Sequence, residues 1–162
     1  MSKKQAEIKA AMPSANVIVS CRGEDGRDNA LVVGYACNCS YDPPMIMVGV
    51  VPSRFSYDLI KQNPSFVVHF ARKDQMEAWE YLGSASGRDG DKLEHLGLTV
   101  VDGDVVNAPV ITDFPVAIEC SVVDSVMTGS HEMFAGKIEA IHADEELVDA
   151  DGKLDLSAGD LI

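Results

Sequence analysis

Polar and aromatic residues that follow a buried apolar run carry the strongest chemical signal in this chain. The apolar run covers residues 45–51, ends at Pro52 and is followed by a helix-like pattern. Between the two lie Ser53, Arg54, Phe55, Ser56 and Tyr57. Arginine can bind two phosphate oxygens at once, and serine hydroxyls and the N–H groups of a helix start can bind the others. These residues predict an anion pocket beside aromatic side chains that suit a flat ring. The alternative is that a serine merely caps the helix and Arg54 is a surface charge.

The segment at residues 33–40 is the second candidate for ligand contact. Its candidate residues are Gly34, Tyr35, Ala36, Cys37, Cys39 and Ser40. A glycine within a strand indicates a bulge or the close approach of another group, and small side chains would let a flat ring approach the backbone. The alternative is a half-buried strand that happens to carry small residues.

Two of the four cysteines, Cys37 and Cys39, form a C-x-C pair. Residues i and i+2 of a strand point to the same face, so the two thiols could lie side by side. A metal site usually needs about four ligands, and no second C-x-C or H-x-H occurs, so we predict no metal site. Redox activity of the pair remains one alternative, and simple packing of two small side chains is the other.

The pattern of elements predicts a mainly β fold with short helices. Expected strands are at residues 15–21, 29–35, 45–51, 66–70, 98–101, 110–111, 116–127 and 133–142. Expected helices are at residues 56–62 and 74–82, with a third that begins at the N-cap Asp91. Alternating βαβ units are missing, which favours a small barrel with helical insertions over a doubly wound sheet. We expect residues 1–162 to form a single domain.

Charge and hydropathy exclude several classes of partner. The 26 acidic and 13 basic residues give a net charge of −13, which argues against nucleic acid and anionic membranes as partners. No apolar run approaches the ~20 residues that span a bilayer, and the charged N-terminus lacks the apolar region of a signal peptide. We therefore expect a cytoplasmic protein.

Residues 40–60 also carry a family resemblance. The segment reads S-Y-D-P-P-M-I-M-V-G-V-V-P-S-R-F-S-Y-D-L-I. It resembles the flavin reductase-like (flavoredoxin-like) family, whose members carry a Ser-x-x-Pro-Pro turn, an apolar strand and an Arg-x-Ser-Tyr-Asp-Leu-Ile run. The resemblance covers roughly residues 14–155. It implies an FMN-binding split β-barrel and a homodimer with the flavin at or near the subunit interface.

The resemblance also implies roles for the candidate residues. The segment around Arg54 would bind the FMN phosphate, and residues 33–40 would lie along the isoalloxazine ring and ribityl chain, with Ser40 near the phosphate. The S-G-R-D-x-D-K segment would bring Arg88 and Lys92 near the cofactor to balance its charge. A Gly-Ser-His turn would bring His131 near the flavin and the nicotinamide, where an imidazole could hold the nicotinamide amide or donate a proton.

For the loops that carry Arg88 and His131, the residues themselves leave simpler alternatives open. The glycines around Arg88 could merely form a loop that leads into a capped helix, and His131 could be an exposed turn residue. Family members more often carry apolar or hydroxyl residues at the positions of Cys37 and Cys39, so contact between these thiols and the flavin becomes a further possibility.

The implied activity is flavin reduction. NAD(P)H would deliver hydride to the flavin, which would pass electrons to a second flavin or to a protein acceptor. The first alternative is an FMN-binding electron carrier without NAD(P)H activity, whose acidic surface would dock on a basic redox partner. The second alternative is a binding protein that has lost flavin.

Overall fold

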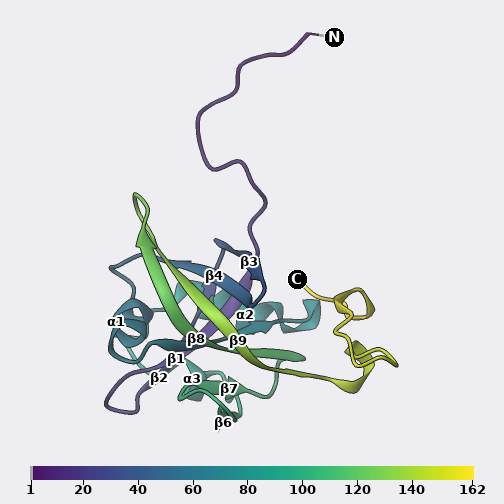
Figure 1. The fold of residues 1–162 in the computed structure, drawn as a ribbon. Helices are drawn as coiled ribbons and strands as arrows, with labels where there is room; N and C mark the ends of the chain where they lie inside the picture. The colour runs from purple at the N-terminus through teal and green to yellow at the C-terminus, as the bar shows by residue number, and fades with distance from the viewer. Residues whose placement is uncertain (1) are drawn as a thin grey trace.

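Seven antiparallel strands form one curved sheet, the main feature of this computed structural model (Figure 1). The structure describes residues 2–162. The strand order is β2-β1-β5-β8-β9-β4-β3. The strands are β1 (Val17–Arg22), β2 (Asp28–Val33), β3 (Ala36–Tyr41), β4 (Pro44–Val50), β5 (Ser65–Phe70), β8 (Val116–Met127) and β9 (Glu132–Ala143). A separate two-stranded sheet pairs β6 (Val100–Asp102) with β7 (Pro109–Ile111).

A two-residue corner brings the two edges of the large sheet together. β2 and β3 lie at opposite ends of the strand order, yet only Gly34 and Tyr35 separate them in the chain. The sheet must therefore curl until its edges meet, although the two edge strands do not pair. Backbone bonds from Ala15 N–H to the Gly34 carbonyl (2.8 Å) and from Gly49 N–H to the Tyr35 carbonyl (2.7 Å) hold this corner. The result is an open barrel.

The corner differs from the sequence prediction of one strand over residues 29–35. β2 ends at Val33, the chain bends at Gly34 and Tyr35, and a separate strand, β3, follows. β3 has only β4 as a neighbour and is largely exposed. Because β3 is largely exposed, its sequence shows no apolar alternation that would set its bounds. The strand geometry assumed for Cys37 and Cys39 is nevertheless confirmed, since both lie in β3.

The helices are short and pack against the sheet. They are α1 (Phe55–Gln62), α2 (Met76–Ser84) and α3 (Lys92–His95), with 3₁₀ turns η1 (Lys73–Gln75), η2 (Glu145–Leu147) and η3 (Leu156–Ala158). Helix α1 packs at the main core, and α2 and α3 pack at a second cluster of buried residues. The mainly β architecture with short helices is therefore confirmed. Among the described residues no helix is both long enough and apolar enough to cross a membrane.

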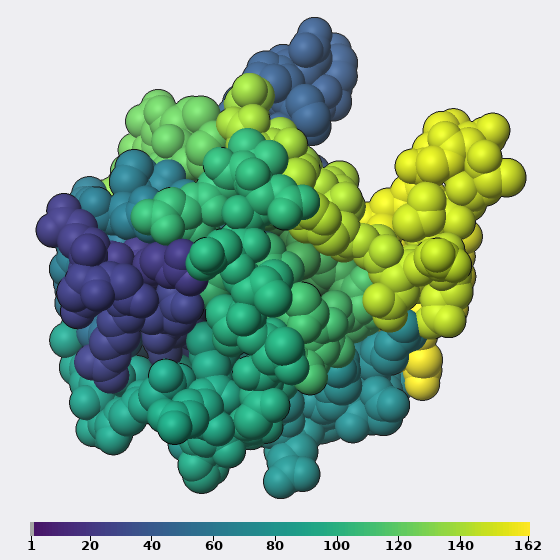
Figure 2. Space-filling model, turned by 90° about the horizontal axis from the view of Figure 1, so that it is seen from below, coloured from purple at the N-terminus to yellow at the C-terminus, as the bar shows by residue number. Residues whose placement is uncertain are grey.

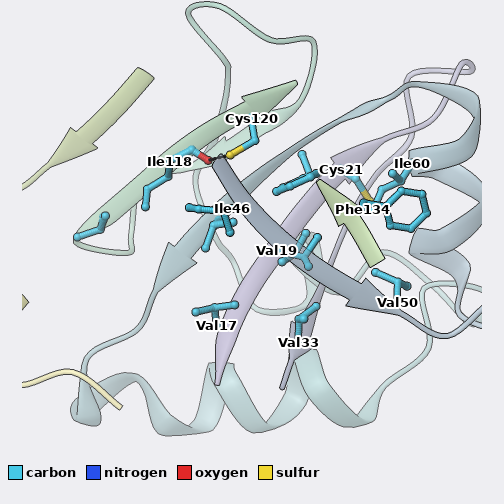
Figure 3. Packing of buried hydrophobic residues seen from close by; sticks show 14 of the residues in the cluster. Val17, Val19, Cys21, Val33, Ile46, Val50, Ile60, Ile118, Cys120 and Phe134 are labelled. Atoms are coloured by element: carbon cyan, nitrogen blue, oxygen red, sulfur yellow. Dashed lines mark hydrogen bonds between the residues drawn. The ribbon is translucent and has the colours of Figure 1, made fainter. Parts of the chain in front are cut away.

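The barrel interior is filled by alternate residues of the strands (Figure 3). Val17, Val19 and Cys21 of β1 point into this core, where they meet residues such as Phe134 of β9 and Ile60 of α1. Period-two alternation explains this arrangement. The intervening residues of β1 face the other side, where Ile18 packs in a second cluster with Leu82 of α2.

The C-terminal segment folds back on the start of η1. Arg72 forms ion pairs with Asp144 (2.8 Å) and Glu146 (2.7 Å), and Ile162 N–H donates to the Ala71 carbonyl (3.0 Å). In the space-filling view this segment, in yellow, forms a lobe at the side of the molecule (Figure 2). The acidic end of the chain thus contributes ion pairs as well as surface charge.

A fully buried carboxylate anchors the loop between β6 and β7. Glu119 accepts backbone hydrogen bonds from Asp104 (3.0 Å), Val105 (2.9 Å) and Val106 (2.9 Å), and its Oε1 lies 2.6 Å from Nε2 of His142. Burial raises the pKa of Glu119, but these hydrogen bonds outweigh it and lower the pKa to about 2. Side-chain atoms of Asp104, Glu119 and His142 lie within 4.8 Å of one another. Three of the four partners of Glu119 are backbone N–H groups of the β6–β7 loop, so its carboxylate holds this loop against β8.

Replacement of Glu119 by Gln should lower the free energy of unfolding by about 3 kcal/mol at pH 7, because an amide cannot accept all these bonds. In the wild-type protein the folded pKa of Glu119 lies below its ordinary value of 4.5. Its stabilising effect is therefore complete above pH 4.5 and lost as the pH falls towards 2. Urea unfolding at pH 7 and pH 3.5 would measure both effects, with Glu80→Gln, an exposed carboxylate, as the control. Equal stability losses in the two variants would contradict the anchor.

Candidate functional site

Residues 53–56, which follow β4 and include the first residues of α1, form a polar surface that we call the cradle. After Val50 the chain turns, with Arg54 N–H donating to the Val51 carbonyl at 2.9 Å, and α1 begins at Phe55. Arg54 occupies the N-cap position with extended backbone angles, and no side chain caps the helix. Of the alternative given above, the part in which a serine caps the helix is therefore wrong, whereas the side chain of Arg54 is indeed exposed. The positive end of the helix dipole is left to interact with an anion.

The cradle opens into a cavity of about 140 Å³. Its walls come from the start of α1 with the residues just before it, from β2, from the end of α2, and from the following loop and the first residue of α3. The polar lining residues are Asn29, Ser53, Arg54, Ser56, Ser84, Ser86 and Lys92. Hydroxyl, amide and cationic groups with no carboxylate among them make this cavity suited to an anion.

Lys92 is the most buried cation at this cavity, with 4% of its surface exposed. Its Nζ donates to the carbonyls of Leu82 (2.8 Å) and Ala85 (3.1 Å) at the end of α2. An ammonium group has three hydrogens, so one is left for a ligand. Burial lowers the pKa of Lys92 to about 8; Cys21 opposes this shift, and the positive charge of Arg54 adds to it. Two cations that repel one another across a small cavity favour an anion between them.

Arg88 lies outside the cavity and has an ion partner. Its Nη2 is 3.0 Å from Asp58, and its guanidinium lies 5.5 Å from the ring centroid of Phe55. The guanidinium of Arg27 contacts the same ring at 4.6 Å. Phe55 therefore contacts two cations, and it also lines the cavity.

Tyr57 points away from the cradle. Its hydroxyl donates to the Glu132 carboxylate of β9, which also accepts from Ser125 (2.6 Å) and Lys61 (3.3 Å). Hydrogen bonds from Ser125 and Tyr57 lower the pKa of Glu132. These contacts tie α1 to the β8–β9 hairpin, and Tyr57 does not line the cavity at the start of α1.

Tyr35, Ser130 and His131 form a separate group, the histidine cluster, which joins the corner of the barrel to the turn of the long hairpin. The rings of Tyr35 and His131 lie with centroids 4.7 Å apart, inclined at 49°. Oγ of Ser130 is 2.8 Å from Nδ1 of His131. The hairpin, predicted from sequence and confirmed, projects from the barrel (Figure 1). Its distant turn thus reaches the same place as Gly34 and Tyr35.

β3 extends away from the cradle along β4. Ala36 pairs with Val48 near the cradle end of β4, whereas Ser40 pairs with Met45 at its far end. At about 3.3 Å per residue, Met45 and Val50 are roughly 16 Å apart. None of the predicted residues from Gly34 to Ser40 lines the cavity, and neither does His131. A single chain therefore presents the predicted phosphate and ring contacts as two separate surfaces.

Two residues of the cradle escaped the sequence analysis. The amide of Asn29 donates to Oγ of Ser56 at 2.8 Å. A Cβ atom on Gly87 would lie 2.5 Å from both Asn29 Oδ1 and Phe55 Cδ1, so the loop packs directly against the cradle. The available signals were a glycine in the Ser86–Lys92 motif and a polar residue in an apolar strand, and neither identifies its distant partner.

Comparisons with known proteins extend over most of the chain. Residues 9–155 match the family described as Flavin reductase like domain. The structure is similar to that of flavoredoxin from Desulfovibrio vulgaris (Miyazaki F), with a TM-score of 0.88 and 29% identity, covering 97% of this chain and 84% of that one. With the open barrel described above, this likeness confirms the predicted split β-barrel.

The relatives found by sequence include proteins with and without a described activity. An uncharacterized protein of Aeropyrum pernix is 27% identical over 85% of this chain; the chain covers 52% of that protein, about half its length. FMN reductase (NADH) RutF of Acinetobacter baylyi is 24% identical over 87% of this chain and 74% of that protein.

Replacement of Gly87 by Ala should lower the free energy of unfolding by roughly 1–3 kcal/mol, because the added methyl group collides with Asn29 and Phe55. Urea unfolding would measure the loss. Gly129→Ala is the matched control, since nothing lies within 4 Å of a Cβ at Gly129. If both variants unfolded at the same urea concentration as the wild type, the close packing of the loop on the cradle would be refuted.

Proposed function

Because this chain belongs to the flavin reductase-like family, we propose that it binds FMN and transfers electrons from NAD(P)H through the flavin to an acceptor. The observation that carries the proposal is the cavity at the start of α1. It combines Arg54, the buried Lys92 and an uncapped helix terminus. This set of donors fits the terminal phosphate that distinguishes FMN from riboflavin.

The size of the cavity supports binding of one end of the cofactor. Complete small-molecule sites usually have volumes of roughly 300–1,000 Å³, whereas this cavity has about 140 Å³. A phosphate and the adjoining part of the ribityl chain fit such a volume. The flavin ring would lie along residues 34–40, where small side chains permit close approach.

The flavin, when bound, supplies hydride and electron transfer. The residues of this chain bind and orient it. Arg54 and Lys92 compensate the phosphate charge, and Ser53 and Ser56 offer hydroxyl groups to its oxygens. The contact of Ser130 with Nδ1 of His131 leaves Nε2 to donate a hydrogen bond or a proton to the nicotinamide or the reduced ring.

A second copy of the chain would complete the ring site. The small cavity in the single chain supports this proposal, as do the exposed side chains of Tyr35, Tyr41, Val126 and Met127 around β3 and the hairpin. A homodimer would cover these apolar groups and would bring another surface to residues 34–40. The net charge of −13 would then favour a basic redox protein as acceptor.

The alternative is an FMN-binding electron carrier that does not oxidise NAD(P)H. The likeness to flavoredoxin supports it, whereas the relative described as an NADH-dependent FMN reductase supports the enzyme. The purified protein, loaded with FMN and desalted, should lose its visible absorbance under argon when NADH or NADPH is added. Bleaching by dithionite alone would favour the carrier, and failure to retain or reduce FMN would contradict both functions.

Replacement of Arg54 by Gln should weaken FMN binding by about 10- to 100-fold, because a charge-assisted contact to the phosphate is lost. Riboflavin, which has no phosphate, should bind both proteins alike. Quenching of flavin fluorescence would measure the four dissociation constants. Arg72→Gln, which removes an arginine paired with Asp144 and Glu146, is the control. An equal loss of FMN and riboflavin affinity would refute phosphate binding by Arg54.

Replacement of His131 by Gln should lower the rate of flavin reduction by NADH about 10- to 100-fold, with little change in FMN affinity. Anaerobic stopped-flow absorbance would measure this rate. His95→Gln provides a matched control, because His95 stacks on Tyr81 with ring centroids 4.5 Å apart and does not contact Tyr35, Ser130 or His131. An unchanged reduction rate in His131→Gln would exclude the histidine from hydride transfer.

A further inference from the structure

The four cysteines fall into two chemically different pairs. Cys21 and Cys120 are fully buried in the core, and burial raises the pKa of each thiol to about 12. Such thiols are inert towards reagents in solution. Cys37 and Cys39, in contrast, are both exposed, two residues apart on one strand. Only this second pair is accessible to a redox partner.

The backbone that carries the exposed pair is less constrained than the rest of the sheet. β3 is an edge strand, paired with β4 alone. Its register shifts between Asn38 and Ser40: Asn38 pairs with Ile46 and Ser40 with Met45, so Cys39 has no partner opposite it. This is a β-bulge, in which the extra residue lies outside the regular ladder. Movement at Cys39 therefore breaks no regular cross-strand pairing.

The bulge matters because of the distance that a disulfide requires. Residues two apart in a regular strand have Cα atoms about 6.6 Å apart, at the upper limit of the roughly 4.4–6.8 Å that disulfides span. A bulge bends the strand and disrupts the regular ladder, so this separation is not fixed at the value of a regular strand. Partial burial raises the pKa of Cys39, and the thiol of Cys37, two residues away, raises it further.

We propose that Cys37 and Cys39 form a redox-active dithiol that cycles to an intrachain disulfide by exchange with small-molecule disulfides. A thiolate of Cys37 attacks the small disulfide, forms a mixed disulfide and releases one thiolate. Cys39, as its thiolate, then attacks Sγ of Cys37, which forms the protein disulfide and releases the second thiolate. Two cysteine thiols lose two electrons and two protons, and one small-molecule disulfide becomes two thiols.

The surroundings of the pair favour this exchange. The β3–β4 turn, in blue, projects from the surface in the space-filling view (Figure 2), and Cys39 lies two residues before Tyr41, the last residue of β3. A small disulfide can therefore approach without opening the barrel. Closure of the disulfide would draw in the edge strand that begins at Ala36, directly after the corner at Gly34 and Tyr35.

The test uses the flavin-free protein in glutathione buffers, so that its result is independent of flavin binding. After equilibration at pH 8, free thiols are blocked with an alkylating reagent and the protein is digested with trypsin. Cleavage after Arg27 and Arg54 releases residues 28–54, a peptide that contains Cys37 and Cys39 but neither Cys21 nor Cys120. In oxidised buffer this peptide should lack two hydrogens and carry neither label nor glutathione. In reduced buffer it should carry two labels.

The single variants Cys37→Ser and Cys39→Ser provide the matched controls, since each leaves one exposed thiol. Their peptides should carry one glutathione in oxidised buffer, because no neighbouring thiol can displace it. Two glutathiones on the wild-type peptide, two labels in fully oxidised buffer, or a disulfide between two chains would each overturn the proposal. The wild-type result decides the matter even where a variant folds poorly.

Discussion

The two-residue connection between β2 and β3 is the constraint on which the rest of the structure depends. Across Gly34 and Tyr35 the chain can span at most about 11 Å, yet it joins strands at opposite edges of a seven-stranded sheet. The sheet must therefore curl, and alternate residues of most of its strands fill the core on its inner face. The same corner brings residue 35 against the hairpin turn that carries His131. The same two-residue connection therefore closes the barrel and brings one part of the candidate site together.

The charge of the cavity at α1 is opposite in sign to the net charge of the chain. The chain as a whole is acidic, but the cavity at α1 is lined by two cations and no carboxylate. Acidic groups near by are engaged elsewhere, as with Asp58 and Arg88 or Glu132 and Tyr57. A small positive cavity within an acidic surface suits a compact anion better than a polyanion.

Much of the fold could be predicted because its signals are local. The long hairpin, the strand after Pro64, the N-cap at Asp91 and the apolar run of β4 each follow from period-two alternation, turn residues or capping chemistry, and the structure contains them. The strand geometry around Cys37 and Cys39 could be predicted, but the break between β2 and β3 could not, because an exposed edge strand leaves no apolar pattern. The separation of Gly34 to Ser40 from the cavity was also beyond sequence reasoning, since it depends on strand register.

The sequence by itself determined the mainly β architecture, the helix start at residues 53–57 and the family resemblance, because each resides in contiguous residues whose spacing reflects local backbone geometry. Only the tertiary structure decided which side chains meet. In the folded chain Lys92 donates to the end of α2 and lines the cavity, and Tyr57 donates to Glu132. Gly87 packs against Asn29 and Phe55. The tertiary structure likewise revealed that a bulge frees Cys39 from the ladder. Such contacts join residues far apart in the chain, and they exist only once the sheet has curled.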